Sequence, residues 1–313
     1  MSNIIVIYHG GCADGFCAAW LFHRMYPDAE YIPARYGDVP PDVTGRDVFI
    51  VDFSFSRDLL LKMKEQAKSL VVLDHHKTAQ ADLDGLDFCV FDMTKSGARL
   101  AWEHLYDQNM KDRVKNTFFL GERFRDRPPF LVSYTEDRDL WKWELQYSRA
   151  FNATLRTHEF NFGVWDMLDM APLSYFFDSG GAILRYQAMT VKSKVEQSHL
   201  VIVEYEQNLS TQSHLATVEY EQNLSEQWRC ANATTLISET AGELARETGI
   251  GCCWFEDGTG KRVYSLRSNA DGLNVDVSEI AKRFGGGGHR NAAGFTRQPG
   301  QSHPWVRSTV KAE

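Results

Sequence analysis

The sequence lacks paired cysteines, an excess of positive charge and a long hydrophobic run. Its cysteines include no C-x-x-C pair, which fits reduced thiols better than a disulfide framework. The six are Cys12, Cys17, Cys89, Cys230, Cys252 and Cys253. The formal net charge of -8 argues against a surface that grips long DNA or RNA, because such binding needs many Lys and Arg contacts to phosphates. A local basic pocket stays compatible with that charge.

The N-terminal residues carry no basic leader, and their apolar run at residues 4–8 is shorter than a signal peptide or a membrane span requires. We therefore expect a cytoplasmic protein with no membrane partner. The 313 residues are 43% hydrophobic and 24% charged, which is enough for two globular domains with separate cores. The oligomeric state stays open, a homodimer included.

The first hundred residues alternate short β-branched runs with helix-like segments. This alternation is typical of parallel strands joined by crossover helices, and it predicts a doubly wound α/β domain over residues 1–180. The expected strands are residues 4–8, 48–52, 70–74 and 88–91, and the expected helices include residues 16–25, 57–67 and 98–106.

Residues 181–227 are polar and predict a helical connector. They contain a tandem repeat, in which residues 198–212 (SHLVIVEYEQNLSTQ) recur as residues 213–227 (SHLATVEYEQNLSEQ). If both copies continue one helix, the second adds roughly 22 Å at 1.5 Å per residue. The alternative is an insertion that loops out on the surface. Alternation of strands and helices resumes in residues 228–313, which predict a second, smaller α/β domain.

Metal-capable side chains follow each of the first three predicted strands. In chain order they are His9, Cys12, Asp14, Asp52, Asp74, His75 and His76. Because the carboxyl ends of parallel strands meet at one edge of a sheet, we expect these side chains to converge. Carboxylates and imidazoles gathered in one cleft are unfavourable unless a cation neutralises them, so the pattern indicates a divalent metal centre. The alternative is that Asp52 and Asp74 merely cap the following helices.

A glycine run at residues 285–288 precedes His289 and Arg290. Successive glycines let backbone N–H groups approach a phosphate, and His289, Arg290 and the earlier Arg267 add positive charge. A flexible linker is the alternative, but the run leads into Ala292-Ala293-Gly294-Phe295, which has the character of a packed segment.

These motifs resemble those of the DHH/DHHA1 phosphoesterases. Leu73-Asp74-His75-His76 is similar to the signature that names the family, and the sequence HGGCADG at residues 9–15 is similar to its first motif. Val51-Asp52 is similar to the second motif, and Asp137 within EDRDLW at residues 136–141 to the fourth. GGGGHRNAAGF at residues 285–295, preceded by SLRS at residues 265–268, looks like the glycine-rich motif of a DHHA1 domain.

The resemblance implies two bound divalent ions. Mn²⁺ is the first candidate, and Mg²⁺, Co²⁺ and Zn²⁺ are the alternatives. Asp52 would bridge the ions, His9 would hold one, and the other would be held by Asp14, His75 and Asp137. Two such ions activate water for attack on phosphorus. Asp74 would orient His75, and His76 would bond to the phosphate or the leaving group. The expected catalytic residues are Asp52, Asp74, His75 and His76.

Two positions depart from this pattern. Many relatives have an aspartate in place of Cys12, and a thiol is a softer ligand than manganese prefers, so it stays open whether Cys12 is a metal ligand. Asp139 competes with Asp137 for the fourth motif, because on a strand both would face the same way.

The resemblance also implies a substrate. The residues of this chain that match the DHHA1 motif would bind a small nucleotide or a short single-stranded oligonucleotide, which is the substrate of a phosphodiesterase or phosphatase. The expected substrate-binding residues are Arg267, Gly286, Gly287, Gly288, His289, Arg290 and Asn291. The alternative is a catalytically weakened sensor that binds a nucleotide or RNA. Retained metal-dependent turnover separates the two.

Overall fold

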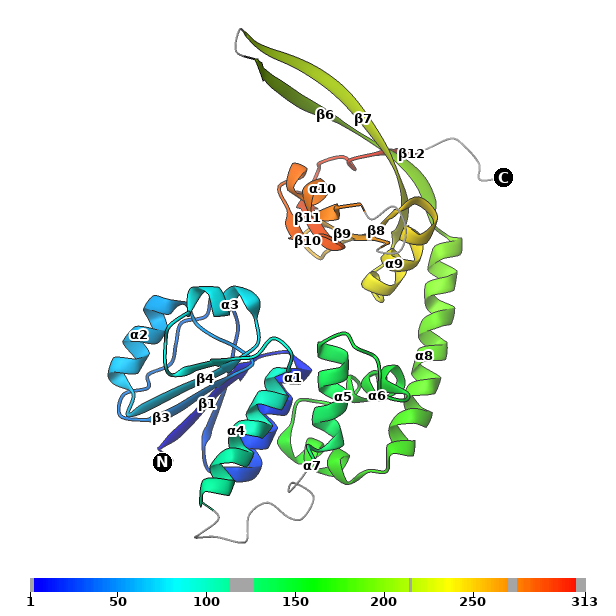
Figure 1. The fold of residues 1–313 in the computed structure, drawn as a ribbon. Helices are drawn as coiled ribbons and strands as arrows, with labels where there is room; N and C mark the ends of the chain where they lie inside the picture. Colours follow the sequence, from blue (N-terminus) through cyan, green and yellow to red (C-terminus); the bar gives the residue numbers. More distant parts are fainter. Residues whose placement is uncertain (1–2, 113–126, 214–215, 270–274, 308–313) are drawn as a thin grey trace. The chain divides into compact units, whose positions relative to one another are not determined.

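The computed structural model divides the chain into two units, Met1–Leu184 and Arg185–Glu313 (Figure 1). It describes residues 3–112, 127–213, 216–269 and 275–307. Among these residues, none of the helices combines the length and the apolar character that a membrane crossing needs. The α/β class predicted from the sequence is confirmed in both units.

The first unit is built on a five-stranded sheet in the order β2-β1-β3-β4-β5, in which every pair of neighbours is parallel. The strands are β1 (Ile4–His9), β2 (Glu30–Ala34), β3 (Asp47–Val51), β4 (Ser69–Asp74) and β5 (Cys89–Phe91). Strand β1 lies between β2 and β3, and the connection from β1 leads to β2 whereas the connection from β3 leads to β4, in the opposite direction along the sheet. The carboxyl ends of β1 and β3 therefore form a topological switch point, where open α/β sheets place their ligands.

Helices cover both faces of this sheet, which confirms the doubly wound prediction. Alternate strand residues point to opposite faces, so Ile5 and Ile7 join one core with residues of α2 (Arg57–Gln66). Val6 joins the other core with α1 (Ala13–Met25) and α4 (Gly97–Asp112). The remaining elements of this unit are α3 (Lys77–Asp82), α5 (Phe130–Asp139), α6 (Ser148–Leu155), α7 (Phe162–Met170) and the first part of α8 (Leu173–Glu196).

Strand β2 is an addition to the predicted elements. It contains Pro33, which lacks a backbone N–H and is tolerated in sheets mainly at an edge, and β2 is indeed the edge strand beside β1. Its end is tied to the loop after β1, because the Gly10 N–H donates to the carbonyl oxygen of Ala34 at 2.9 Å. This bond fixes the end of β2 next to the switch point.

The second unit contains a seven-stranded sheet in the order β10-β11-β9-β8-β7-β6-β12. Its elements are β6 (His199–Ser213), β7 (Ala216–Asn232), α9 (Ile237–Thr248), β8 (Ile250–Glu256), β9 (Arg262–Ser268), α10 (Val277–Arg283), β10 (Gly287–His289), β11 (Ala292–Arg297) and β12 (Val306–Arg307). Strands β7 and β8 are parallel, and the other neighbours are antiparallel. Buried Trp228, Tyr264 and Phe295 belong to its core.

The predicted helical connector is wrong beyond Glu196. Residues 199–213 and 216–232 form the antiparallel pair β6 and β7, and Gln207 pairs with Gln222, the equivalent residue of the other repeat copy (Figure 1). The reason lies in the Val-Glu-Tyr-Glu sequence of both copies. β-branched and aromatic residues that alternate with glutamate have the two-residue period of a strand, and that period outweighs the polar composition that suggested a helix.

Candidate metal centre

Asp52 occupies the switch point, directly after β3. Its φ of 54° lies in the left-handed region, which asparagine and aspartate adopt more readily than other side chains. Its N–H donates to the carbonyl oxygen of Leu73 at 2.9 Å, so β4 holds the residue in place. The side chain is 1% exposed. A strained, buried carboxylate at a ligand-binding edge is typical of a functional position.

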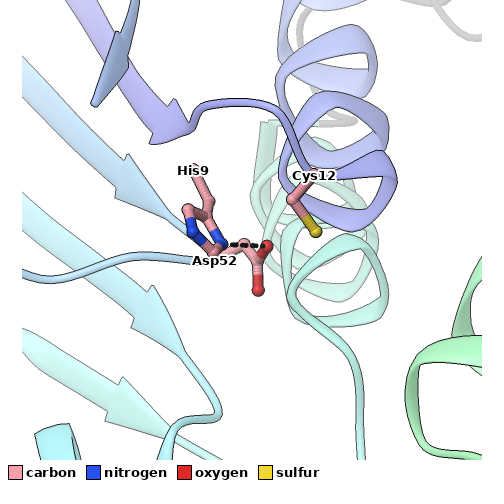
Figure 2. Close-up of side chains that lie close together, drawn as sticks. All are labelled: His9, Cys12 and Asp52. Carbon is pink, nitrogen blue, oxygen red and sulfur yellow. Dashed lines mark ion pairs between the residues drawn. The ribbon is translucent and has the colours of Figure 1, made fainter. Parts of the chain in front are cut away.

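The first ligand group consists of His9, Cys12 and Asp52, whose donor atoms lie within 4.8 Å of one another. His9 extends from the end of β1 and Cys12 from the start of α1, on two sides of the Asp52 carboxylate (Figure 2). His9 Nδ1 and Asp52 Oδ2 are 3.5 Å apart. Both atoms are buried, and neither has a hydrogen-bond partner within the described part of the chain. Two unsatisfied ligand atoms that face each other fit a bound cation.

Cys12 is less suited to manganese than its neighbours. Burial, followed by the charge of Asp52, raises the pKa of the Cys12 thiol to about 12. The thiol therefore keeps its proton near neutral pH unless a metal ion displaces it, and thiolate is a soft ligand that favours zinc.

The second ligand group surrounds His75. Its Nε2 lies 3.1 Å from Asp52 Oδ1, 3.4 Å from Asp139 Oδ2 and 3.7 Å from Asp14 Oδ2. Burial lowers the pKa of His75, but the hydrogen bond to Asp52 and the three carboxylate charges outweigh it and raise this pKa to about 9. Burial, followed by the charges of Asp52 and Asp139, also raises the pKa of Asp14 well above its usual range. The group is thus short of positive charge, which a divalent cation supplies.

Asp52 links the two groups, because its two oxygens face different partners. Oδ2 lies beside His9, and Oδ1 lies beside His75. Burial raises the pKa of Asp52, yet the hydrogen bond to His75 and the adjacent His9 hold this pKa below its usual value, so Asp52 favours the ionised state. The residues present therefore fit a pair of divalent cations that share Asp52.

The N-terminus of α4 holds Asp14. The N–H groups of Gly97 and Ala98 donate to its two oxygens at 2.6 and 3.0 Å. A Cβ atom on Gly97 would come within 2.4 Å of the Asp52 Cβ, so this glycine lets α4 approach the site. Ser96, Gly97 and Ala98 were not among the predicted site residues. The available signal was a serine followed by small residues at the start of a predicted helix, which is an N-cap pattern.

Asp74 orients His76, not His75, which corrects the predicted role. Asp74 Oδ1 accepts hydrogen bonds from the backbone N–H groups of His75 and His76, and it lies 2.7 Å from His76 Nδ1. The physical reason is local, since an aspartate can bond to groups two residues further on. This hydrogen bond raises the pKa of His76. With Nδ1 bonded to Asp74, Nε2 is the remaining nitrogen of the ring.

Of the two aspartates considered for the fourth motif, the structure places Asp139 beside His75, whereas Asp137 bonds elsewhere. Residues 130–139 form helix α5, and two residues on a helix are about 200° apart, so the two aspartates face opposite ways. Asp139 lies with Asp14 and His75. Asp137 Oδ1 instead accepts from the backbone N–H groups of Glu144 and Leu145, at 2.8 and 3.4 Å, and so holds the loop after α5.

The predicted substrate-binding residues gather at one end of the second sheet. Arg267 pairs with Ala292 across β9 and β11, and His289 pairs with Ala292 across β10 and β11. Asn291 Oδ1 accepts from the Ser268 hydroxyl at 3.0 Å, and Arg290 is 3.5 Å from Asp276. His289, Arg290 and Asn291 are exposed. Whether they bind substrate stays a prediction.

Two of the predicted glycines have a packing role in this hairpin. A Cβ atom on Gly286 would lie 2.1 Å from the Gly294 carbonyl oxygen, and one on Gly288 would lie 2.6 Å from the Ala292 oxygen. A Cβ atom on Gly287 would meet nothing within 4 Å. In β10, packing explains why Gly288 must be a glycine, but it does not explain Gly287.

No family model matches the chain. A similar curated protein is the uncharacterized protein R106 of Acanthamoeba polyphaga mimivirus, with 28% identity over 319 residues. The alignment covers 93% of this chain and 66% of that relative, so the chain spans just under two thirds of the relative's length.

Two solved structures are also similar. The pGpG-specific phosphodiesterase PggH of Vibrio cholerae has a TM-score of 0.47 and 14% identity, with 94% of this chain and 93% of that chain covered. An exopolyphosphatase-related protein of Bacteroides fragilis has a TM-score of 0.43 and 13% identity, with 93% and 86% covered.

Proposed function

We propose that this protein is a divalent-metal-dependent phosphoesterase that hydrolyses dinucleotides, short oligonucleotides or other small nucleotides. The observation that carries the proposal is the Asp52 carboxylate, whose two oxygens face two separate ligand groups. The unpartnered atoms His9 Nδ1 and Asp52 Oδ2 support it, because they are ligand atoms buried without a hydrogen bond within the described residues. The motifs around these residues resemble those of DHH phosphoesterases.

We assign the metal ligands from the geometry. His9 and Asp52 would hold one ion, with Cys12 as a further donor, and Asp14, Asp52, His75 and Asp139 would hold the other. Divalent ions bound by such residues lower the pKa of water and offset negative charge on a phosphoryl group. Oxygen and nitrogen donors predominate, which suits Mn²⁺ or Mg²⁺ better than a soft metal.

The other residues of the site supply orientation and protons. Asp74 fixes the His76 ring through Nδ1, at 2.7 Å. His76 Nε2 is then the atom that would donate a proton or a hydrogen bond to the leaving oxygen. The amides of Gly97 and Ala98 keep the Asp14 oxygens in place. This arrangement is preorganised, which is the main requirement for stabilising charge in a transition state.

Two observations bear on the substrate class. The relative PggH is named for pGpG, and the net charge of -8 disfavours long nucleic acids. A 5'-phosphorylated dinucleotide such as pGpG is therefore the first substrate to test. The exposed residues His289, Arg290 and Asn291 remain our candidates for binding its terminal phosphate.

The test combines turnover with a measurement of bound metal. Metal-stripped protein is supplied with Mn²⁺, Mg²⁺, Co²⁺ or Zn²⁺, and its metal content is measured by mass spectrometry. Each form is then incubated with pGpG, short RNAs, 3',5'-bisphosphorylated nucleotides and pyrophosphate. We expect two bound ions and metal-dependent release of mononucleotide. Protein that binds nucleotide tightly but turns over no substrate with any metal would instead be a sensor, and the proposed function would be wrong.

A further inference from the structure

An exposed tyrosine stands beside the candidate metal centre and has no part in the chemistry proposed above. Tyr36 follows β2, and its ring centroid lies 5.8 Å from that of His9 and 6.2 Å from that of His76. Its third aromatic neighbour is the buried Phe53, at 5.1 Å. His9 belongs to the first ligand group, and His76 is the residue proposed to donate to the leaving oxygen. Tyr36 therefore borders the place where a phosphate would be attacked.

The ring of Tyr36 remains available for a further contact. Its side chain is 60% exposed, although large aromatic residues are usually buried. The planes of the neighbouring rings are inclined to it by 65°, 84° and 46°, so none of these three is stacked parallel on it. An aromatic face that the protein leaves uncovered next to a ligand site is suited to stacking on a planar group of the ligand.

A hydrogen-bonded turn positions the backbone of Tyr36. The N–H of Asp38 donates to the Arg35 carbonyl oxygen at 3.0 Å, and the N–H of Arg35 donates to Asp38 Oδ2 at 2.7 Å. Tyr36 and Gly37 are the central residues, and Gly37 has the positive φ of 97° that the second central residue of a type II turn requires. Because the backbone of this turn is already ordered, less conformational entropy is lost when the ring stacks on a ligand.

We propose that Tyr36 stacks on a nucleobase of the substrate and so makes the site selective for nucleotides over other phosphate esters. This inference rests on the proposed function. A single ribose separates the base of a nucleotide from its phosphate, so a phosphate beside His9 and His76 brings a base within reach of the adjacent ring. Stacking does not depend on which base is present, since every base has a π face.

The experiment compares the variants Tyr36→Ala and Tyr36→Phe in the full-length, Mn²⁺-loaded protein. The substrates are pGpG and two analogues of it, each with one guanine replaced by an abasic spacer. Removing the ring should raise KM for pGpG roughly tenfold, within the about 5- to 150-fold that loss of one base stack implies. The turnover number kcat should change little, because the stack is present in both ground and transition states. Tyr36→Phe should behave as the wild type.

The abasic analogues distinguish stacking from support of the histidines. For the analogue that lacks the stacked base, wild type and Tyr36→Ala should have the same KM. An equal loss on pGpG and on both analogues would mean that Tyr36 merely positions His9 or His76, and it would overturn the inference, as would an unchanged KM for pGpG. Tyr186→Ala, at a tyrosine of α8 that is 72% exposed, is the matched control and should change nothing.

A binding measurement separates this inference from the proposed function. If the wild type turns over none of the substrates, the proposed function fails, and calorimetric titration with GMP in the presence of Mn²⁺ then tests Tyr36 alone. Stacking predicts that Tyr36→Ala weakens GMP binding roughly tenfold and that Tyr36→Phe does not. Equal affinity of Tyr36→Ala and wild type would refute the inference in that case too.

Discussion

The edge of the first sheet and the glycine-rich end of the second differ in how their polar groups are satisfied. At the first edge, His9, Asp52 and Asp74 each have a buried side-chain atom without a hydrogen-bond partner among the described residues. At the second, His289 and Asn291 are exposed, and Asn291 bonds to Ser268.

The two regions therefore differ in whether a bound ligand is needed to satisfy their polar groups. Buried ligand atoms that lack partners are costly, so the donor set at the first edge fits a bound cation. The second end requires nothing, because its groups are satisfied by water or by neighbours, and two of its glycines are explained by packing. The geometry of the first edge therefore supports the proposed metal centre, whereas the proposed phosphate site depends on the resemblance.

The most severe test of the first edge is the substitution Asp52→Asn. Asparagine tolerates the left-handed backbone at this position, so the fold should survive. Because one carboxylate serves both ligand groups, we expect kcat/KM for pGpG to fall by at least roughly 1,000-fold, the upper range for loss of one preorganised stabilising group. Asp58→Asn, at an exposed carboxylate in the first turn of α2, is the control. A loss of less than tenfold, with unfolding unchanged, would remove Asp52 from its bridging role.

A second substitution pair separates metal binding from structural support within α5. Asp139→Ala should lower kcat/KM roughly 100-fold, because it removes an oxygen beside His75, and leave the free energy of unfolding of the metal-free protein nearly unchanged. Asp137→Ala should lower that free energy by about 1–3 kcal/mol, because two backbone N–H groups lose their acceptor. Urea unfolding and initial rates measure the two effects. If the effects were exchanged between the two variants, Asp137 would be the ligand.

A third pair asks whether the second end binds phosphate at all. Gly286→Ala should destabilise the protein by about 1–3 kcal/mol, since its methyl group would overlap the Gly294 carbonyl oxygen. Gly287→Ala has room for its methyl group and should leave stability unchanged. If the hairpin binds a phosphate through its backbone, Gly287→Ala should raise KM for pGpG roughly tenfold, or about 1.4 kcal/mol. An unchanged KM would leave these glycines with a packing role only.

Much of the fold was predictable because its physical signals are local. The strands β1, β3, β4 and β5 are short apolar runs, and their ends carry the site residues His9, Asp52 and His75 to one edge. Strand β2 was missed because Pro33 is atypical of strands, although an edge position permits it. The repeat was predicted as a helix because its polar composition concealed a two-residue period.

The errors at the site arose where tertiary structure decides. Asp137 and Asp139 are equivalent candidates until residues 130–139 are known to form a helix, which turns the two side chains apart. The contact of Gly97 with Asp52 joins residues 45 positions apart, and no local pattern reports such a contact. The orientation of His76 by Asp74 likewise depends on rotamers, which sequence patterns do not specify.

The central claim is that Asp52 joins two cation sites, and calorimetric titration of metal-stripped protein with Mn²⁺ tests it most directly. The wild type should bind two ions per chain and gain thermal stability on binding, since an ion that binds only the folded state stabilises it. Asp52→Asn should weaken both sites at once, and Asp58→Asn neither. Wild-type protein that binds no ion, or an Asp52→Asn variant that still binds one ion with unchanged affinity, would contradict the claim.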